Sequence, residues 1–230
     1  MKNMNVIIVS GGRIDIPSSK KKAKEIMRES ETFVIAVDGG LKAVNEMEIM
    51  PNVIIGDFDT VDKNLLQMYE DKEDIIIVRL NPVKDSTDTE EALNYIIKNI
   101  DVKMEEEVIL FGSTGGRFDH SLANLFLMKK ALLENICLKV YTKDSFMFMI
   151  DSDSVIERDE NYKYISFIQF DGPARGVTLK GFKYNIENFN FDTKETFRLG
   201  ISNEFDERFG TIKIMSGCLL IIMSKDDHEC

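Results

Sequence analysis

Residues 108–134 read VILFGSTGGRFDHSLANLFLMKKALLE and contain the signals of a strand, a turn and a helix in succession. Residues 108–111 form a short apolar run typical of a buried strand, and glycine-rich residues follow directly. The segment 119–134 predicts a helix with an apolar face. The residues at helical spacing on that face are Leu122, Leu125, Phe126, Leu132 and Leu133. A strand joined to a helix by a short turn is the repeating unit of α/β proteins.

The same alternation runs through the first 145 residues. Runs rich in Val and Ile, apolar on both faces, predict strands at residues 6–10, 33–37, 53–55, 75–78, 108–111 and 138–142. Thr87-Asp88-Thr89-Glu90 has the form of a capping box, and an apolar helical face follows it. The pattern predicts an N-terminal doubly wound, mostly parallel sheet.

The pattern changes after about residue 150. The charged residues 151–160 predict either a linker or the edge of a hairpin. Short β-type runs follow, separated by turn signals, at residues 164–170, 177–179, 198–201, 211–215 and 218–224. This half predicts an antiparallel β-sandwich, which gives two domains, residues 1–148 and 149–230.

Composition excludes several classes of protein. The chain has 230 residues, of which 43% are hydrophobic and 30% charged, a balance typical of a folded domain. A net charge of -11 argues against a nucleic-acid partner. Three cysteines without CxxC spacing, and no signal-peptide or membrane-spanning pattern, predict a cytoplasmic location and no membrane partner.

Glycines and aspartates collect at or near the predicted strand ends. The motifs are Ser10-Gly11-Gly12, Asp38-Gly39-Gly40, Gly56-Asp57-Phe58-Asp59, Lys84-Asp85-Ser86-Thr87-Asp88, and the nine residues from Gly112 through Gly115, Arg117 and Asp119 to His120. Ligands of open parallel sheets bind at the carboxyl ends of the strands, so these motifs predict a binding site there. Each motif alone has an ordinary alternative, such as a simple turn or a helix-start contact.

The aspartates of these motifs predict a metal site. In an extended segment, Asp57 and Asp59 would point the same way while Phe58 turns into the core. An Asx-turn is the alternative. Carboxylates without cations repel one another, and Mg²⁺ is commonly held by carboxylates together with substrate phosphates. Lys84 and Arg117 add positive charge, and the set predicts metal-dependent phosphoryl-type chemistry with ATP.

In order and spacing, these motifs resemble the thiamine pyrophosphokinase family nearly from end to end. The resemblance includes Thr60 and Asn124 in the first half. In the second half it rests on Gly176-Val177-Thr178-Leu179-Lys180-Gly181, Tyr184 and Ile201-Ser202-Asn203-Glu204. The resemblance implies Mg²⁺-dependent transfer of pyrophosphate from ATP to the hydroxyl of thiamine, with AMP as the second product. It also implies a homodimer with the active site at the interface.

The resemblance also implies roles for individual residues. Metal ligands would be Asp57, Asp59 and Asp88, which with Asp119 make the catalytic set. ATP and its phosphates would contact Gly11, Gly12, Asp38, Gly39, Gly40, Lys84, Asp85, Thr87, Gly115 and Arg117. Thiamine would contact Asp119, His120, Tyr184, Ser202 and Asn203.

One departure from the family pattern concerns the thiamine pocket. Some relatives stack thiamine on a tryptophan, and this chain has none. Tyr184, Phe205 or Phe209 would take its place, since an aromatic face attracts a cationic ring. The aspartate that serves as general base is not assigned. Two alternatives stay open, a pyrophosphokinase for another hydroxymethyl heterocycle such as a pterin, and a non-catalytic nucleotide or thiamine sensor.

Overall fold

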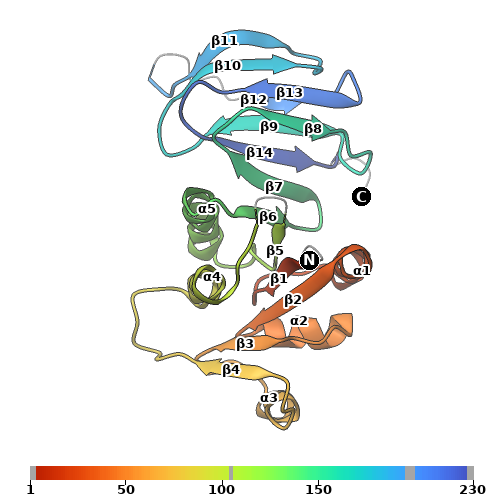
Figure 1. The fold of residues 1–230 in the computed structure, drawn as a ribbon, viewed down its shortest axis with the longest axis vertical. Helices are drawn as coiled ribbons and strands as arrows, with labels where there is room; N and C mark the ends of the chain where they lie inside the picture. The colour runs from red at the N-terminus through yellow and green to blue at the C-terminus, as the bar shows by residue number, and fades with distance from the viewer. Residues whose placement is uncertain (1–3, 104–105, 195–199, 227–230) are drawn as a thin grey trace. The chain divides into compact units, whose positions relative to one another are not determined.

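The computed structural model describes residues 4–103, 106–194 and 200–226, and the chain divides into two units, Met1–Lys143 and Asp144–Cys230 (Figure 1). This division lies close to the boundary predicted after residue 148. Each unit has its own apolar core. Among the described residues, no helix is long and apolar enough to span a membrane.

The first unit is built on a parallel sheet in the order β6-β5-β1-β2-β3-β4. Its strands are β1 (Met4–Val9), β2 (Glu31–Val37), β3 (Val53–Gly56), β4 (Ile76–Arg79), β5 (Glu107–Phe111) and β6 (Cys137–Tyr141). The predicted burial on both faces is wrong for β4, where Ile76 is 52% exposed, because this strand lies at the edge of the sheet.

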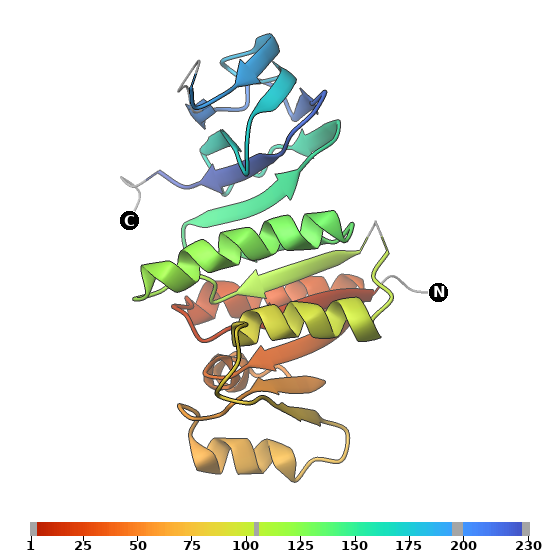
Figure 2. The same cartoon turned by 90° about the vertical axis from the view of Figure 1, so that its left-hand side faces the viewer.

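Helices cover both faces of this sheet. They are α1 (Ile16–Glu29), α2 (Gly40–Met47), α3 (Lys63–Glu70), α4 (Asp88–Asn99) and α5 (Phe118–Leu133). Residues of α1, α2 and α3 share one core cluster with one side of the strands. Figure 2 shows α4 and α5 in front of the strands with α1 behind. The doubly wound fold is therefore confirmed.

The strand order sets the position of a ligand cleft. Strand β1 lies between β5 and β2, so the chain winds outward from β1 in both directions. At the carboxyl ends of β1 and β5, the loops that follow these two neighbouring strands run apart. A place where the loops of adjacent strands run apart is called a topological switch point, and open α/β sheets bind ligands there. The motif that follows β1 and the glycine-rich motif that follows β5 meet there.

The second unit consists of antiparallel strands in two layers, as predicted. One layer has the order β12-β9-β14-β7 and the other β11-β10-β13-β8. The strands are β7 (Ser145–Ile150), β8 (Ser154–Glu157), β9 (Tyr164–Gln169), β10 (Ala174–Lys180), β11 (Ile186–Phe191), β12 (Gly200–Asn203), β13 (Phe209–Lys213) and β14 (Leu219–Ser224). Both layers contribute to one core, which includes Phe148, Phe167 and Ile212.

The structure corrects two further sequence predictions. Residues 151–160 are not a linker, because β8 lies within them and pairs with β13 at the edge of its layer. The second correction concerns α5, which buries Asn124, Leu127, Met128 and Ala131 rather than the predicted face. The predicted strand at 198–201 lies partly outside the described residues.

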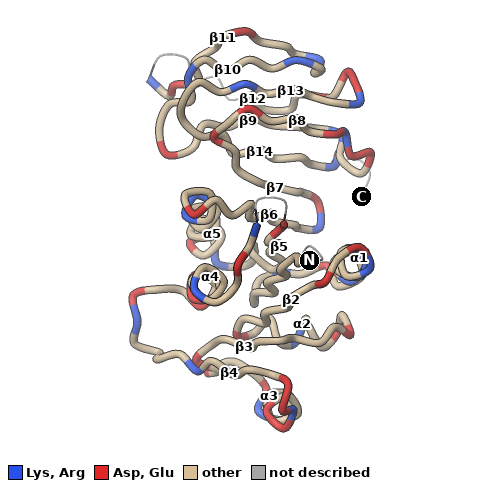
Figure 3. The backbone as a smooth tube through the Cα atoms, viewed as in Figure 1, with Lys and Arg blue, Asp and Glu red and all other residues tan. Residues whose placement is uncertain are grey.

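Charged residues of both signs are interspersed along both units (Figure 3). The excess of acidic over basic residues, which gives the net charge of -11, is therefore not gathered on a single element. Local clusters of carboxylates, rather than the overall charge, mark the candidate site.

Candidate active site

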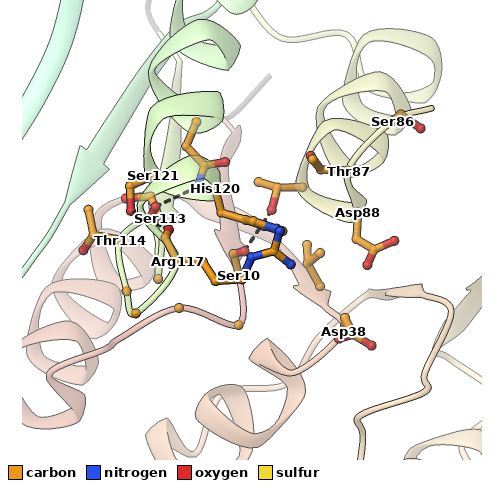
Figure 4. A pocket seen from close by; sticks show the side chains of 18 of the residues that line it. Ser10, Asp38, Ser86, Thr87, Asp88, Ser113, Thr114, Arg117, His120 and Ser121 are labelled. Atoms are coloured by element: carbon orange, nitrogen blue, oxygen red, sulfur yellow. Dashed lines mark hydrogen bonds between the residues drawn. The ribbon is translucent and has the colours of Figure 1, made fainter. Parts of the chain in front are cut away.

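A cleft of about 730 Å³ opens at the carboxyl ends of the parallel strands (Figure 4). Its walls come from the turns after β1, β2, β3 and β5, from the loop between β4 and α4, and from the first turns of α4 and α5. Among the predicted site residues, those that line it are Gly11, Gly12, Asp38, Asp57, Lys84, Thr87, Asp88, Gly115, Arg117 and His120. This volume is typical of a small-molecule site.

The two glycine turns pack against each other through their backbones. Gly12 N–H donates to the Gly112 carbonyl at 3.0 Å, and Arg13 N–H donates to the Thr114 carbonyl at 2.6 Å. A Cβ at residue 12 would lie 2.3 Å from each of those two carbonyl oxygens. Glycine is therefore required at position 12 by close packing, and its N–H is already bonded within the protein.

The remaining predicted glycines differ in their access to the cleft. Gly11 lines the cleft and lies against Gly39, which with Gly40 falls outside the lining residues. A Cβ at Gly40 would lie 2.0 Å from the Val9 carbonyl oxygen. The turns after β1 and β2 therefore touch directly, and Gly40 serves this contact.

Three carboxylates converge beside the cleft. One oxygen each from Asp38, Asp57 and Asp59 lies within 4.8 Å of the others. The predicted extended geometry is wrong, since Phe58 has φ +63° and Asp59 N–H donates to Asp57 Oδ1 at 3.1 Å, as in an Asx-turn. Phe58 does turn into the core, as predicted. The backbone of Asp38 is also in the left-handed region, with φ +44°.

The electrostatics of this cluster fit a divalent cation. The negative charge of Asp57, with smaller contributions from burial and Asp38, raises the pKa of Asp59. Asp38 Oδ2 accepts a hydrogen bond from the Thr60 hydroxyl at 2.8 Å. Asp38 Oδ1 is buried and has no hydrogen-bond partner among the described residues. Oxygen ligands that repel one another, one of them buried without a donor, suit Mg²⁺.

Asp88, predicted as a ligand of the same metal, lies outside this group of three. Its carboxylate forms an ion pair with Lys84 at 2.9 Å, and the hydrogen bond to Asp88 raises the pKa of Lys84. Thr87 caps α4 by accepting a hydrogen bond from Glu90 N–H at 3.1 Å, whereas the Glu90 carboxylate pairs with Lys130. The N-cap half of the predicted capping box therefore supplies the helix start. Asp85 is exposed and does not line the cleft.

Arg117 and Asp119 form a pair at the start of α5. Two hydrogen bonds, of 2.6 and 3.3 Å, join the guanidinium to the carboxylate. The pair is exposed, and the hydrogen bond from Arg117 lowers the pKa of Asp119 to about 2. His120 follows on the same turn and lines the cleft (Figure 4).

Two buried hydrogen bonds at the cleft join residues that were not among the predicted site residues. The hydroxyls of Ser10 and Thr89 lie 2.9 Å apart and connect the end of β1 to α4. Asn124 donates to the Ser113 carbonyl at 2.7 Å and holds the glycine-rich turn on α5. In the sequence, the signal that could have identified Thr89 and Asn124 is a polar residue at a helix position whose neighbours on the same face belong to the core.

The predicted thiamine residues of the second unit lie at the end of β12 and on the bend between β10 and β11, which hydrogen bonds join. Asn203 is buried, accepts from Tyr184 N–H at 3.0 Å and donates to the Tyr184 carbonyl at 2.9 Å. Tyr184 is 62% exposed, and Ser202 is exposed with φ +58°. Of the other candidate aromatics, Phe205 packs on Phe182 at 5.1 Å between ring centroids, and Phe209 is 46% exposed.

Fold and cleft together define a doubly wound α/β protein with a polar ligand site at its switch point, joined to a β-sandwich unit. The model of the thiamin pyrophosphokinase catalytic domain matches residues 24–140, and that of the vitamin B1 binding domain matches residues 153–219. The chain belongs to the thiamine pyrophosphokinase family.

Individual relatives agree with this assignment. The thiamine pyrophosphokinase of Bacillus subtilis is 33% identical, and the match covers 98% of this chain and all of the relative. The crystal structure of the B. subtilis thiamine pyrophosphokinase superposes with a TM-score of 0.82 at 31% identity, over 96% of this chain and 99% of that one. For the Geobacillus thermodenitrificans structure the TM-score is 0.81 at 26% identity, with coverage of 97% and 99%.

Proposed function

We propose that this chain transfers pyrophosphate from ATP to the hydroxyl of thiamine, giving thiamine diphosphate and AMP. The observation that carries the proposal is the acid cluster of Asp38, Asp57 and Asp59 beside a cleft that also presents Lys84 and Arg117. Phosphoryl-type transfer depends on positioning and charge neutralisation, and this arrangement supplies both.

We assign Asp38, Asp57 and Asp59 as the residues that hold Mg²⁺, with Asp88 beside the phosphates. When bound, the ion would neutralise charge on the transferred phosphates. Asp88 is already paired with Lys84. The Lys84 ammonium, whose pKa is raised, is fully charged at neutral pH and offers phosphate oxygens a donor.

The N-terminal turns of α4 and α5 provide further contacts for the phosphates. Helix N-termini favour anions, because their first N–H groups lack partners within the helix. Arg117, at the start of α5, adds a guanidinium that matches phosphate geometry. In this structure Asp119 accepts two hydrogen bonds from the guanidinium, and it would give up one of them when a phosphate or the acceptor binds. Asp119 is a weak base while paired, because its pKa is about 2.

On the acceptor side, we propose that Tyr184 stacks on the thiamine ring, with Ser202 and Asn203 beside it. Tyr184 combines high exposure with a backbone fixed by Asn203. An aromatic face attracts a cation such as thiamine. Phe205 is less suited, because it packs on Phe182.

We further propose that the protein is a cytoplasmic homodimer with its active site at the interface. Exposed apolar side chains of α5 support this, since Leu122, Phe126 and Leu133 of the predicted face are 44%, 55% and 68% exposed. Phe118, which precedes that face, is 79% exposed. A contiguous exposed apolar face is typical of an association surface. The face begins beside Arg117, so a second copy docked there would adjoin the cleft.

The activity is tested with purified protein, ATP, Mg²⁺ and thiamine. We expect thiamine-dependent release of AMP, with a mass increase of the acceptor that corresponds to pyrophosphate. Release of ADP, or AMP release that is independent of thiamine, would contradict the proposal. A hydroxymethyl pterin as acceptor tests the alternative substrate class, and binding without turnover would indicate a sensor.

A further inference from the structure

We infer that Phe58 and Arg79 act as positioning residues for the metal cluster, holding the turn that directs Asp57 and Asp59 toward Asp38. Neither side chain is a ligand. The inference rests on the metal site of the proposed function and concerns how the fold makes that site.

Phe58 adopts an unusual backbone conformation between two of the carboxylates. Its φ of +63° lies in the left-handed region, which bulky residues rarely adopt without support from their surroundings. This conformation replaces an extended segment with a turn. The turn brings one carboxylate oxygen each of Asp57 and Asp59 within 4.8 Å of each other and of a carboxylate oxygen of Asp38. The cluster therefore depends on an unfavourable conformation at residue 58.

Burial of the Phe58 ring provides one support for this conformation. The residue is only 9% exposed, and its ring belongs to the core cluster that also contains Ile54 and Leu66. A Cβ at Gly56 would lie 3.1 Å from Phe58 Cε1 and 3.1 Å from the Asp38 Cβ. The absence of a side chain at position 56 thus lets the ring and Asp38 approach the same point of β3.

Arg79 provides the second support, from the neighbouring strand. It lies opposite Gly56 in the β3–β4 register, and its guanidinium carbon sits 5.2 Å from the centroid of the Phe58 ring. An ion pair with Glu70 of α3 holds the guanidinium in place. Stacking of this kind favours one ring position. Burial in the core and the contact with Arg79 therefore fix the position of the Phe58 ring, and through it the positions of the two aspartates.

The test measures Mn²⁺ binding to the metal-free full-length protein by electron paramagnetic resonance, without substrates. We expect Phe58→Ala to weaken Mn²⁺ binding by about tenfold or more, as loss of outer-shell support typically does. Ile26→Ala is the matched control, because Ile26 is a buried apolar side chain of α1 in the same unit and is not among the residues argued to hold the Phe58 ring. It should lower thermal stability but leave Mn²⁺ affinity unchanged.

Arg79→Met gives a test whose sign separates positioning from charge. Removing a nearby positive charge by itself strengthens cation binding, so weaker Mn²⁺ binding in this variant indicates lost positioning. Unchanged or tighter binding would overturn the role of Arg79. Equal affinities of Phe58→Ala and the wild type would overturn that of Phe58. Asp57→Asn is the reference: if Mn²⁺ binding is the same as in the wild type, the proposed metal site itself fails.

Discussion

At the residue scale, the acid cluster depends on backbone conformations that few side-chain-bearing residues adopt. Asp38 and Phe58 both have positive φ, and these two turns bring together aspartates from the ends of different strands. Such conformations cost free energy and persist only where the surroundings determine them. Their occurrence at the cleft is consistent with a role in binding rather than in stability.

Substitution of Asp57 tests the cluster directly. Asp57→Asn keeps an oxygen that can accept the hydrogen bond from Asp59 N–H but removes the charge. We expect kcat to fall by about 100-fold or more, because charge neutralisation at the phosphates is lost. Thermal stability of the metal-free protein should not decrease, since repulsion with Asp59 is relieved. Steady-state kinetics and thermal unfolding measure the two effects, and unaltered kcat would exclude Asp57 from the metal site.

The Arg117–Asp119 pair makes a prediction about pH. Arg117→Met should return the pKa of Asp119 from about 2 toward its ordinary value of 3.8, as followed by carboxyl NMR titration. Because the folded pKa is depressed, the stabilisation from the pair is complete above about pH 4. It is lost as the pH falls through 2. A titration midpoint unchanged by Arg117→Met would contradict the observed pairing.

At the scale of elements, the site is made by turns that pack backbone against backbone. The turns after β1 and β5 share two hydrogen bonds, and those after β1 and β2 touch through glycines. The side-chain cap of α4 and a buried pair of hydroxyls then fix the turns to α4, and the Asn124 amide fixes the glycine-rich turn to α5. The cleft is therefore preformed by short-range contacts between neighbouring elements of one unit.

Two glycine substitutions distinguish the close packing at Gly12 from the general effect of replacing a glycine in this wall of the cleft. Gly12→Ala places a methyl group 2.3 Å from two carbonyl oxygens, so we expect a loss of about 1–3 kcal/mol in the free energy of unfolding. Gly116→Ala, on the same cleft wall, meets no atom within 4 Å and should change it by less than about 0.5 kcal/mol. Urea denaturation measures both, and equal losses would contradict the packing role of Gly12.

At the scale of the whole molecule, the exposed face of α5 bears on assembly. The double substitution Leu122→Lys and Leu133→Lys places charges on that face, and we expect a dimer to dissociate into monomers in sedimentation velocity. Met68→Lys on α3 is the control, because Met68 is 61% exposed but lies on another helix. A dimer that survives the double substitution would remove α5 from the interface.

The sequence by itself determined the alternation of strands and helices, the sandwich of the second unit and the motifs at the strand ends. These features are encoded locally, because hydrophobic periodicity, capping residues and glycine turns act over a few residues. The resemblance to the family followed from the order and spacing of those motifs, and the comparisons confirm it. For residues 151–160 the sequence left a linker and the edge of a hairpin both open, because an exposed edge strand can be highly charged, and the pairing of β8 with β13 decides for an edge strand.

Only the tertiary structure decided which acids meet and which helix face is buried. Asp38 and Asp57 are distant in sequence, and their approach depends on the pairing of β2 with β3 and on the turn at Phe58. Which side of α5 is buried likewise depends on which side packs against the sheet. Leu122 and Leu133 belong to the predicted apolar face but are exposed, so the apolar pattern did not identify the buried side. Periodicity identifies an apolar face, but long-range packing determines which partner covers it.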